Sequence, residues 1–220
     1  SYQWASSSDL SSWSNIGTAN TYTLTQSEVG KYIRVTASYT DDDGTVESHT
    51  DTHVVTVANL NDATTGAVTI SGTPTEDQQL SAVTSALTDE DGLGSFSYQW
   101  KRAGTAVSGA TSSTYTLTQS DVGSAMTVTV SYTDGQNTAE SVTSAATAAV
   151  ANVNDATAGA VTITGTVAED SVLTAVTSAL SDEDGLGSFS YQWARAGTAI
   201  GSATSSTYTL TQSDVGSAMT

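Results

Sequence analysis

Carboxylates and carboxamides recur in short clusters along this chain, and their types and spacing suit the binding of a hard cation. The stretch "DEDG" starts at Asp89 and returns at Asp182, and "NDA" starts at Asn61 and returns at Asn154. Calcium takes about six to eight oxygen ligands, which Asp, Glu, Asn and backbone carbonyls supply. Magnesium and the transition metals prefer other geometries or nitrogen and sulfur ligands. The clusters therefore indicate calcium as the chemistry to test.

A shift of 93 positions relates much of the chain to itself. The stretch "SALTDEDGLGSFSYQW" at 85–100 returns at 178–193 with one change, and "STYTLTQSDVGSAMT" at 113–127 returns at 206–220. A fixed period of this kind predicts a repeat architecture. We expect the C-terminal part of one repeat at 1–60, a complete repeat at 61–153 and the N-terminal part of a third at 154–220. The chain is then expected to be a window from a longer array.

Composition excludes several functions. The chain holds 23 acidic residues and five Lys or Arg, for a formal charge of −18. This charge repels nucleic acids and anionic membrane surfaces, so neither is an expected partner. With no cysteine, disulfides and thiolate metal sites are ruled out. No apolar stretch approaches about 20 residues, and no signal peptide is visible.

Apolar residues alternate with polar ones in one repeat, which is typical of half-buried strands. Trp100 and Val130 lie on runs of this kind, and we expect their faces to form the core. A buried Trp, about 90 residues and frequent turn signals favour an immunoglobulin-like β-sandwich. The fold class predicted is all-β, with tandem sandwiches of about 93 residues arranged end to end. The expected strands are 67–72, 79–87, 96–102, 113–118, 125–133 and 140–150, and the segment 103–110 is a candidate short edge strand.

Alternating strand directions place the acidic loops at the two ends of such a sandwich. When copies are stacked end to end, the acidic loops at the C-terminal end of one copy face those at the N-terminal end of the next. The two linkers between copies are 58–63 and 151–156. Glu90 and Glu183 are left out of the predicted ligands because they can point outward, and Asp134 lies at the entry end of the complete copy. The predicted ligands of the second joint are Glu76, Asp77, Asp121, Asn152, Asn154, Asp155, Asp182 and Asp184. Those of the first joint are Asn59, Asn61, Asp62, Asp89 and Asp91, with Glu28 contributed by the first copy.

The alternative for these acids is that they are solvated loop residues with capping and turn roles. Asp-Gly is a common turn signal, and "DEDGLG" does not fit the calcium loop of an EF-hand. The recurrence of the acidic clusters only partly supports a binding site, because duplication of a repeat also copies residues that have no function.

The motifs "VANVNDA", "DxDG" and "SYQW…TYTLTQSDVG", with an acidic pair soon after the first strand, carry a family resemblance. The chain resembles the cadherin-like and immunoglobulin-like extender repeats of giant bacterial surface adhesins, many of them exported by type I secretion. The resemblance implies an extracellular or cell-surface location, calcium-stiffened linkers, neighbouring repeats as partners and a spacer role in adhesion or biofilm formation. The chain departs from the family at Thr64 and Thr157, where proline is frequent.

Other functions stay open, although we expect no enzyme. His49 and His53 are expected at the surface of the last strand of the first copy, with no third nitrogen or sulfur ligand nearby. One alternative is a subunit of a self-assembling filament, sheath or surface layer, which would polymerise where a spacer stays monomeric. The second alternative is a carbohydrate-binding module that uses Trp13. Glycans would then change tryptophan fluorescence, and Trp13→Ala would abolish the change.

Overall fold

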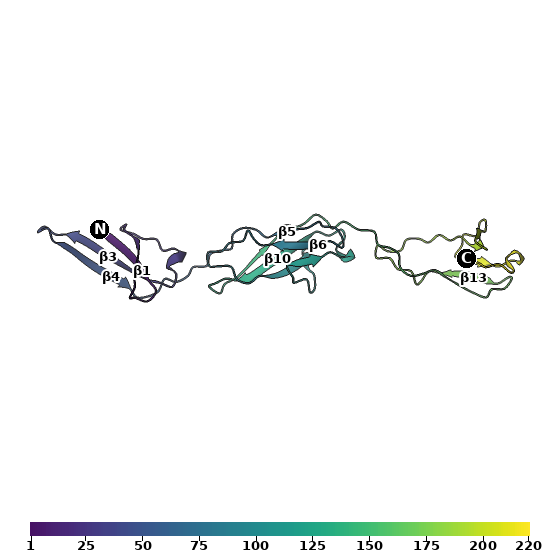
Figure 1. Ribbon diagram of the computed structural model, residues 1–220, viewed down its shortest axis with the longest axis horizontal. Helices are drawn as coiled ribbons and strands as arrows, with labels where there is room; N and C mark the ends of the chain where they lie inside the picture. Colours follow the sequence, from purple (N-terminus) through teal and green to yellow (C-terminus); the bar gives the residue numbers. More distant parts are fainter. The chain divides into compact units, whose positions relative to one another are not determined.

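Short antiparallel strands build the whole chain, which a computed structural model describes over residues 1–220 (Figure 1). The fold is all-β, as the period-two pattern predicts, and its only helical elements are three short 3-10 turns. The chain forms two compact units, which are described separately below. The first comprises 1–74, 78–116 and 124–150, and the second comprises 75–77, 117–123 and 151–220.

The first unit begins with a four-stranded sheet in the order β2-β1-β3-β4. All its pairs are antiparallel, and Trp4 lies opposite Val35, which in turn lies opposite Asp51. Trp4 stacks on Tyr22, which lies outside the strands. The elements are β1 (Tyr2–Ser7), β2 (Ser14–Gly17), η1 (Gln26–Glu28), β3 (Tyr32–Thr40) and β4 (Val46–His53).

Two further sheets of the first unit come from the segment that the sequence analysis treats as the complete repeat (teal in Figure 1). One sheet has the order β5-β6-β9 and the other has the order β11-β10-β7-β8. Their elements are β5 (Thr69–Ser71), β6 (Gln79–Val83), β7 (Ser97–Arg102), β8 (Thr105–Ala106), β9 (Thr114–Thr116), β10 (Met126–Thr133) and β11 (Ala139–Thr143).

The predicted core residues of this segment are buried. Trp100, Met126, Val128 and Val130 are fully inaccessible to solvent, and Val128 lies directly opposite Trp100 in the sheet. Tyr132 is also buried and meets Phe96 edge to face. Alternation of apolar and polar residues on β10 therefore places one face in the core, as the sequence predicts.

The second unit repeats part of this arrangement. Thr162 pairs with Val176 as Thr69 pairs with Val83, a shift of 93 positions from Thr69 to Thr162. Its small core contains Leu173, Trp193 and Leu210. The elements are η2 (Gln119–Asp121), β12 (Thr162–Thr164), β13 (Val172–Val176), β14 (Ala194–Arg195), β15 (Thr198–Ala199), β16 (Thr207–Thr209) and η3 (Gln212–Asp214).

Four strands are at least three residues shorter than the sequence predicts. Those expected at 67–72 and 113–118 cover only 69–71 and 114–116, and the other two end early. The strand expected at 79–87 ends at Val83, because the next residues turn and Leu87 N–H donates to Thr84 O. The strand expected at 140–150 ends at Thr143. Beyond Thr143, the N–H groups of residues 144, 147 and 150 donate to the carbonyls of residues 128, 126 and 124, respectively. Each step of three residues on one segment thus matches a step of two on the other. This mismatch breaks the regular ladder. The predicted edge strand at 103–110 is confirmed as β8.

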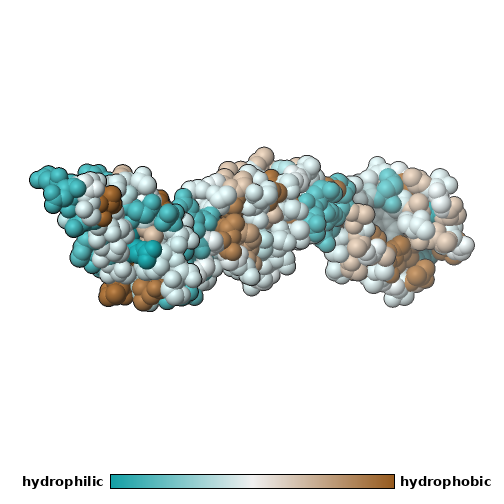
Figure 2. All heavy atoms as spheres, turned by 60° about the vertical axis from the view of Figure 1, so that its left-hand side comes forward, coloured by the Kyte–Doolittle hydropathy of each residue, from teal (hydrophilic) through white to brown (hydrophobic).

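Residues of intermediate hydropathy cover much of the face that Figure 2 shows. Figure 2 shows large near-white areas, the colour of Ser, Thr and Gly, between separate brown and teal patches. None of the helical elements is long and apolar enough to cross a membrane.

Candidate metal centre

A buried glutamate anchors the candidate site in the second unit. Glu76 is 2% exposed, and its N–H donates to Ala151 O at 2.9 Å. The Val153 N–H donates to Glu76 Oε2 at 3.2 Å. Thr75 forms a parallel bridge with Ala151, which holds the segment 75–77 against the start of the linker. Local backbone pairing therefore positions the Glu76 carboxylate beside the linker.

Three carboxylates converge at this point. One oxygen each from Glu76, Asp155 and Glu183 lies within 4.8 Å of the other two, a spacing that suits ligands of one cation. Glu76 is buried, Asp155 is half-buried and Glu183 is exposed. Glu76 and Asp155 belong to the predicted ligands, whereas the sequence analysis left Glu183 out.

The loop at 182–184 holds the linker through its two aspartates. Asp184 Oδ2 accepts from Asp155 N–H at 2.9 Å, and Asp184 Oδ1 accepts from Asn152 Nδ2 at 2.7 Å. Asp182 Oδ2 accepts from Thr157 Oγ1 at 2.8 Å, and its Oδ1 accepts from Asp184 N–H at 3.0 Å. Carboxylates at these positions organise the loop before any cation binds.

Electrostatic repulsion is concentrated on Asp155. Burial raises the pKa of this carboxyl group, and the charges of Asp184, Asp77 and Asp182 raise it further. Such crowding of like charges disfavours the ionised form, and a bound cation would reverse that effect. The local field at Asp155 would therefore favour a bound cation.

Gln119, on the turn η2, also reaches Glu76. With its amide nitrogen facing the carboxylate, Nε2 lies 2.8 Å and 2.9 Å from the two Glu76 oxygens and 3.2 Å from Asn152 Oδ1. Gln119 is not among the ligands predicted from the sequence. A signal for it exists, because "TQS" recurs before an acid at Gln26, Gln119 and Gln212.

Three of the acidic residues cap turns. Thr118 donates from N–H and Oγ1 to Asp121 Oδ2 at 2.9 Å and 3.0 Å, and Thr25 does the same to Glu28 Oε2 at 3.0 Å and 2.9 Å. Asp214 occupies the matching place in η3. Asp121 and Glu28 are therefore cap residues and lie outside the carboxylate group, although both were predicted as ligands.

A related arrangement surrounds Asp91 in the first unit. This residue is 5% exposed, and its carboxylate accepts from Asp62 N–H at 2.8 Å and from Gln26 Nε2 at 2.9 Å. Asp91 N–H donates to Asp89 Oδ1 at 2.9 Å.

Two buried oxygens near these loops have no hydrogen-bond partner. They are Asn59 Oδ1 and Asp134 Oδ2. Asp134 is 5% exposed, and its other oxygen accepts from Gln136 N–H and Thr138 N–H. The neighbouring Gly135 N–H donates to Asp91 O at 3.1 Å. An unpaired buried carboxylate oxygen is costly, and a cation is one way to satisfy it.

The remaining predicted ligands take other places. Asn154 donates to the backbone at Asp155 O, and Asn61 donates to Glu140 Oε1 at 3.0 Å. Asp77 has a positive φ of 61°, and its N–H donates to Leu117 O. The structure thus brings together Glu76, Asp155, Asn152, Asp182 and Asp184 in one set, with Asp77 close enough for its charge to act on Asp155. It brings together Asp62, Asp89 and Asp91 in the other.

The residues considered for other chemistry lie elsewhere. His49 and His53 are both exposed on β4, as expected. The Trp13 ring is half-buried under the guanidinium of Arg34, whose central carbon lies 4.4 Å from the ring centroid, and Trp13 Nε1 donates to Leu10 O. This packing leaves less of the ring open to a sugar.

Comparison with known proteins identifies no relative: no family model, curated protein or solved structure matches the chain.

Proposed function

We propose that the chain is part of a tandem array of immunoglobulin-like repeats that serves as a calcium-stiffened spacer in a large extracellular bacterial adhesin. Residues 61–153 would form one complete repeat, and 1–60 and 154–220 would be parts of the two neighbouring repeats. Ca²⁺ would bind at the linkers, with neighbouring repeats as the partners. The role would be mechanical, with no catalytic activity, and would hold a distal adhesive domain away from the cell.

The observation that carries this proposal is the convergence of Glu76, Asp155 and Glu183 at a linker. These residues come from a loop, the linker and a second loop, so a shared cation would tie three segments together. The hydrogen bond from Asp155 N–H to Asp184 recurs from Asp62 N–H to Asp91. An oxygen-only set of carboxylates and amides matches the preference of calcium.

Calcium would act on the linker as a reversible brace. Extracellular modules commonly bind Ca²⁺ with Kd near about 10⁻⁴–10⁻³ M. Millimolar calcium outside the cell would therefore fill the sites, and submicromolar cytosolic calcium would leave them empty. The chain would be flexible during export and stiff afterwards.

Thermal unfolding and small-angle scattering, each in calcium and in chelator, test the proposal. For a Kd of about 10⁻⁴ M, about 10 mM Ca²⁺ is expected to add about 2.7 kcal/mol to the stability of the folded state. Scattering should show a rod that becomes flexible on chelation. Asp155→Ala and Asp184→Ala should weaken both responses, because they remove the site at 151–156 and leave the one at 58–63. Asp42→Ala, at an exposed loop acid, should keep both responses in full. Equal unfolding temperatures with and without calcium would contradict the proposal.

A self-assembling filament subunit is the second candidate. Growth of large particles in calcium, seen in the same scattering experiment, would favour this candidate over the monomeric spacer.

A further inference from the structure

We propose that Gln119 is an amide switch at the cation site. In the cation-free protein its Nε2 donates to Glu76, and in the bound protein its Oε1 faces the cation and becomes a ligand. This inference rests on the proposed cation site and adds to it a residue that sets affinity.

The first state follows from the geometry around Glu76. All three atoms near the end of the Gln119 side chain, namely both Glu76 oxygens and Asn152 Oδ1, are acceptors. A neutral amide donor satisfies them when no cation is present. Glu76 is only 2% exposed, so water cannot replace the Gln119 amide. Loss of that amide would leave a buried carboxylate with too few hydrogen-bond donors.

The second state needs a rotation of the terminal amide and a shift of the side chain away from Glu76, because Nε2 occupies the position that the cation would take. The nitrogen and oxygen of a carboxamide are nearly the same size, so a half-turn about the last side-chain bond exchanges them without moving the backbone. Nε2 is nearly equidistant from the two Glu76 oxygens, at 2.8 Å and 2.9 Å, which is the direction from which a cation binds a carboxylate through both oxygens. Amide carbonyls are ordinary calcium ligands. Gln119 therefore stands where it can serve either state.

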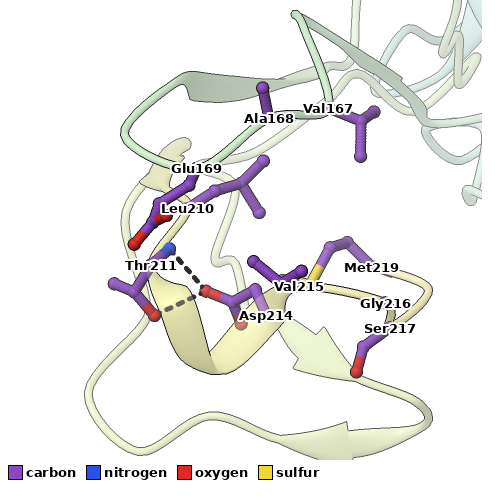
Figure 3. A pocket seen from close by; sticks show the side chains of 10 residues that line it. All are labelled: Val167, Ala168, Glu169, Leu210, Thr211, Asp214, Val215, Gly216, Ser217 and Met219. Atoms are coloured by element: carbon purple, nitrogen blue, oxygen red, sulfur yellow. Dashed lines mark hydrogen bonds between the residues drawn. The ribbon is translucent and has the colours of Figure 1, made fainter.

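The chain contains a matched pair that lacks the other carboxylates. Gln212 Nε2 lies 3.2 Å and 3.0 Å from the Glu169 oxygens, with its amide in the same orientation. Figure 3 shows Glu169 beside the turn that carries Thr211 and Asp214. Glu169 is exposed, however, and belongs to no carboxylate group. Substitutions at Gln212 thus change the same pair without a cation site.

Two substitutions of opposite character test the switch, with calcium titration calorimetry and thermal unfolding of the full 220-residue chain. Gln119→Leu removes donor and ligand, so calcium affinity should fall roughly tenfold and the unfolding temperature in chelator should fall. Gln119→Glu removes the donor but adds a charged ligand, so the unfolding temperature in chelator should fall while calcium affinity rises roughly tenfold. Gln212→Leu and Gln212→Glu should leave affinity within about twofold.

The outcomes separate the switch from the site itself. Wild-type affinity retained in Gln119→Leu overturns the switch while the cation site stands. Gln119→Glu could instead lose the same stability in chelator and in calcium, with no gain in calcium affinity. That result would show that Gln119 is purely structural and would also overturn the switch. Wild-type protein that takes up no calcium overturns the proposed function, and the switch with it.

Discussion

At the scale of single residues, the acids of this chain fall into two groups that differ in their partners. Asp214 has several donors: Thr211 N–H and Oγ1 at 2.8 Å, Arg195 Nε at 2.6 Å and Tyr208 OH at 3.1 Å. Asp155 instead has other carboxylates around it, which raise its pKa. The first group stabilises turns as anions, and the second is where a cation would contribute most.

Acid should expose the role of Asp214. Burial alone would raise the pKa of its carboxyl group, but the hydrogen bonds of Thr211, Arg195 and Tyr208 lower it from 3.8 to about 2. A folded-state pKa below the unfolded value gives stability that is present above pH 3.8 and is lost as pH falls toward 2. Asp214→Asn should lower the unfolding temperature at pH 7 and flatten its fall over that range.

Thermal unfolding followed from pH 7 to pH 2 measures this effect. Asp42→Asn, at an exposed loop, is the control and should keep the wild-type slope. An Asp214→Asn protein with the wild-type slope would show that this carboxylate is not a source of the acid sensitivity.

At the scale of elements, tight loop crossings bring the linker to the acidic loop. Ala158 pairs with Ser181, directly before Asp182, and Thr65 pairs with Thr88, directly before Asp89. Gly159 follows this pairing with φ of +89°, and a Cβ there would lie 2.0 Å from Ala179 O. Only glycine fits a backbone with this φ that approaches the turn at Ala179 so closely.

Gly159→Ala should therefore destabilise the second unit. The added methyl group collides with backbone, and the positive φ adds strain, so we expect a loss of about 1–3 kcal/mol in the free energy of unfolding. Gly187→Ala is the matched control, because a Cβ at Gly187 meets nothing within 4 Å. Denaturant unfolding measures both variants. Equal stability of the two would show that the backbone at Gly159 relaxes without cost.

At the scale of the whole molecule, charge imbalance opposes folding. The formal charge of −18 comes from 23 acids and only five Lys or Arg, so most carboxylates have no basic side chain to pair with. Self-repulsion of this kind destabilises a folded chain and is screened by salt. The same imbalance makes divalent cations effective, because each one neutralises two charges.

Salt should stabilise the calcium-free chain. Raising NaCl from about 0.02 M to about 0.5 M in chelator should raise the unfolding temperature by roughly 2–5 °C, since screening shortens the range of repulsion to a few ångströms. In millimolar calcium the rise should be smaller, because bound cations already offset the charge. Calorimetry in both conditions measures it, and an unfolding temperature that falls with salt in chelator would contradict the argument.

The sequence by itself determined the all-β class, the places of most strands and the core residues Trp100, Val128 and Val130, because alternation with period two follows directly from strand geometry. It also placed Glu76 and Asp155 among the candidate ligands, because alternating strand directions put their segments at the same end of a sandwich. Strand ends at Val83 and Thr143 were not predictable, since they depend on local turns and on a mismatch of hydrogen bonds between two strands.

Only the tertiary structure decided which acids meet. Asp121 and Glu183 have the same charge, yet one caps a turn and the other joins the carboxylate group. Sequence spacing does not record the direction of a side chain on a loop, which is set by contacts with segments far along the chain. Gln119 shows the same limit of pattern reading, because a neutral amide carries no charge signal until its distance to Glu76 is known.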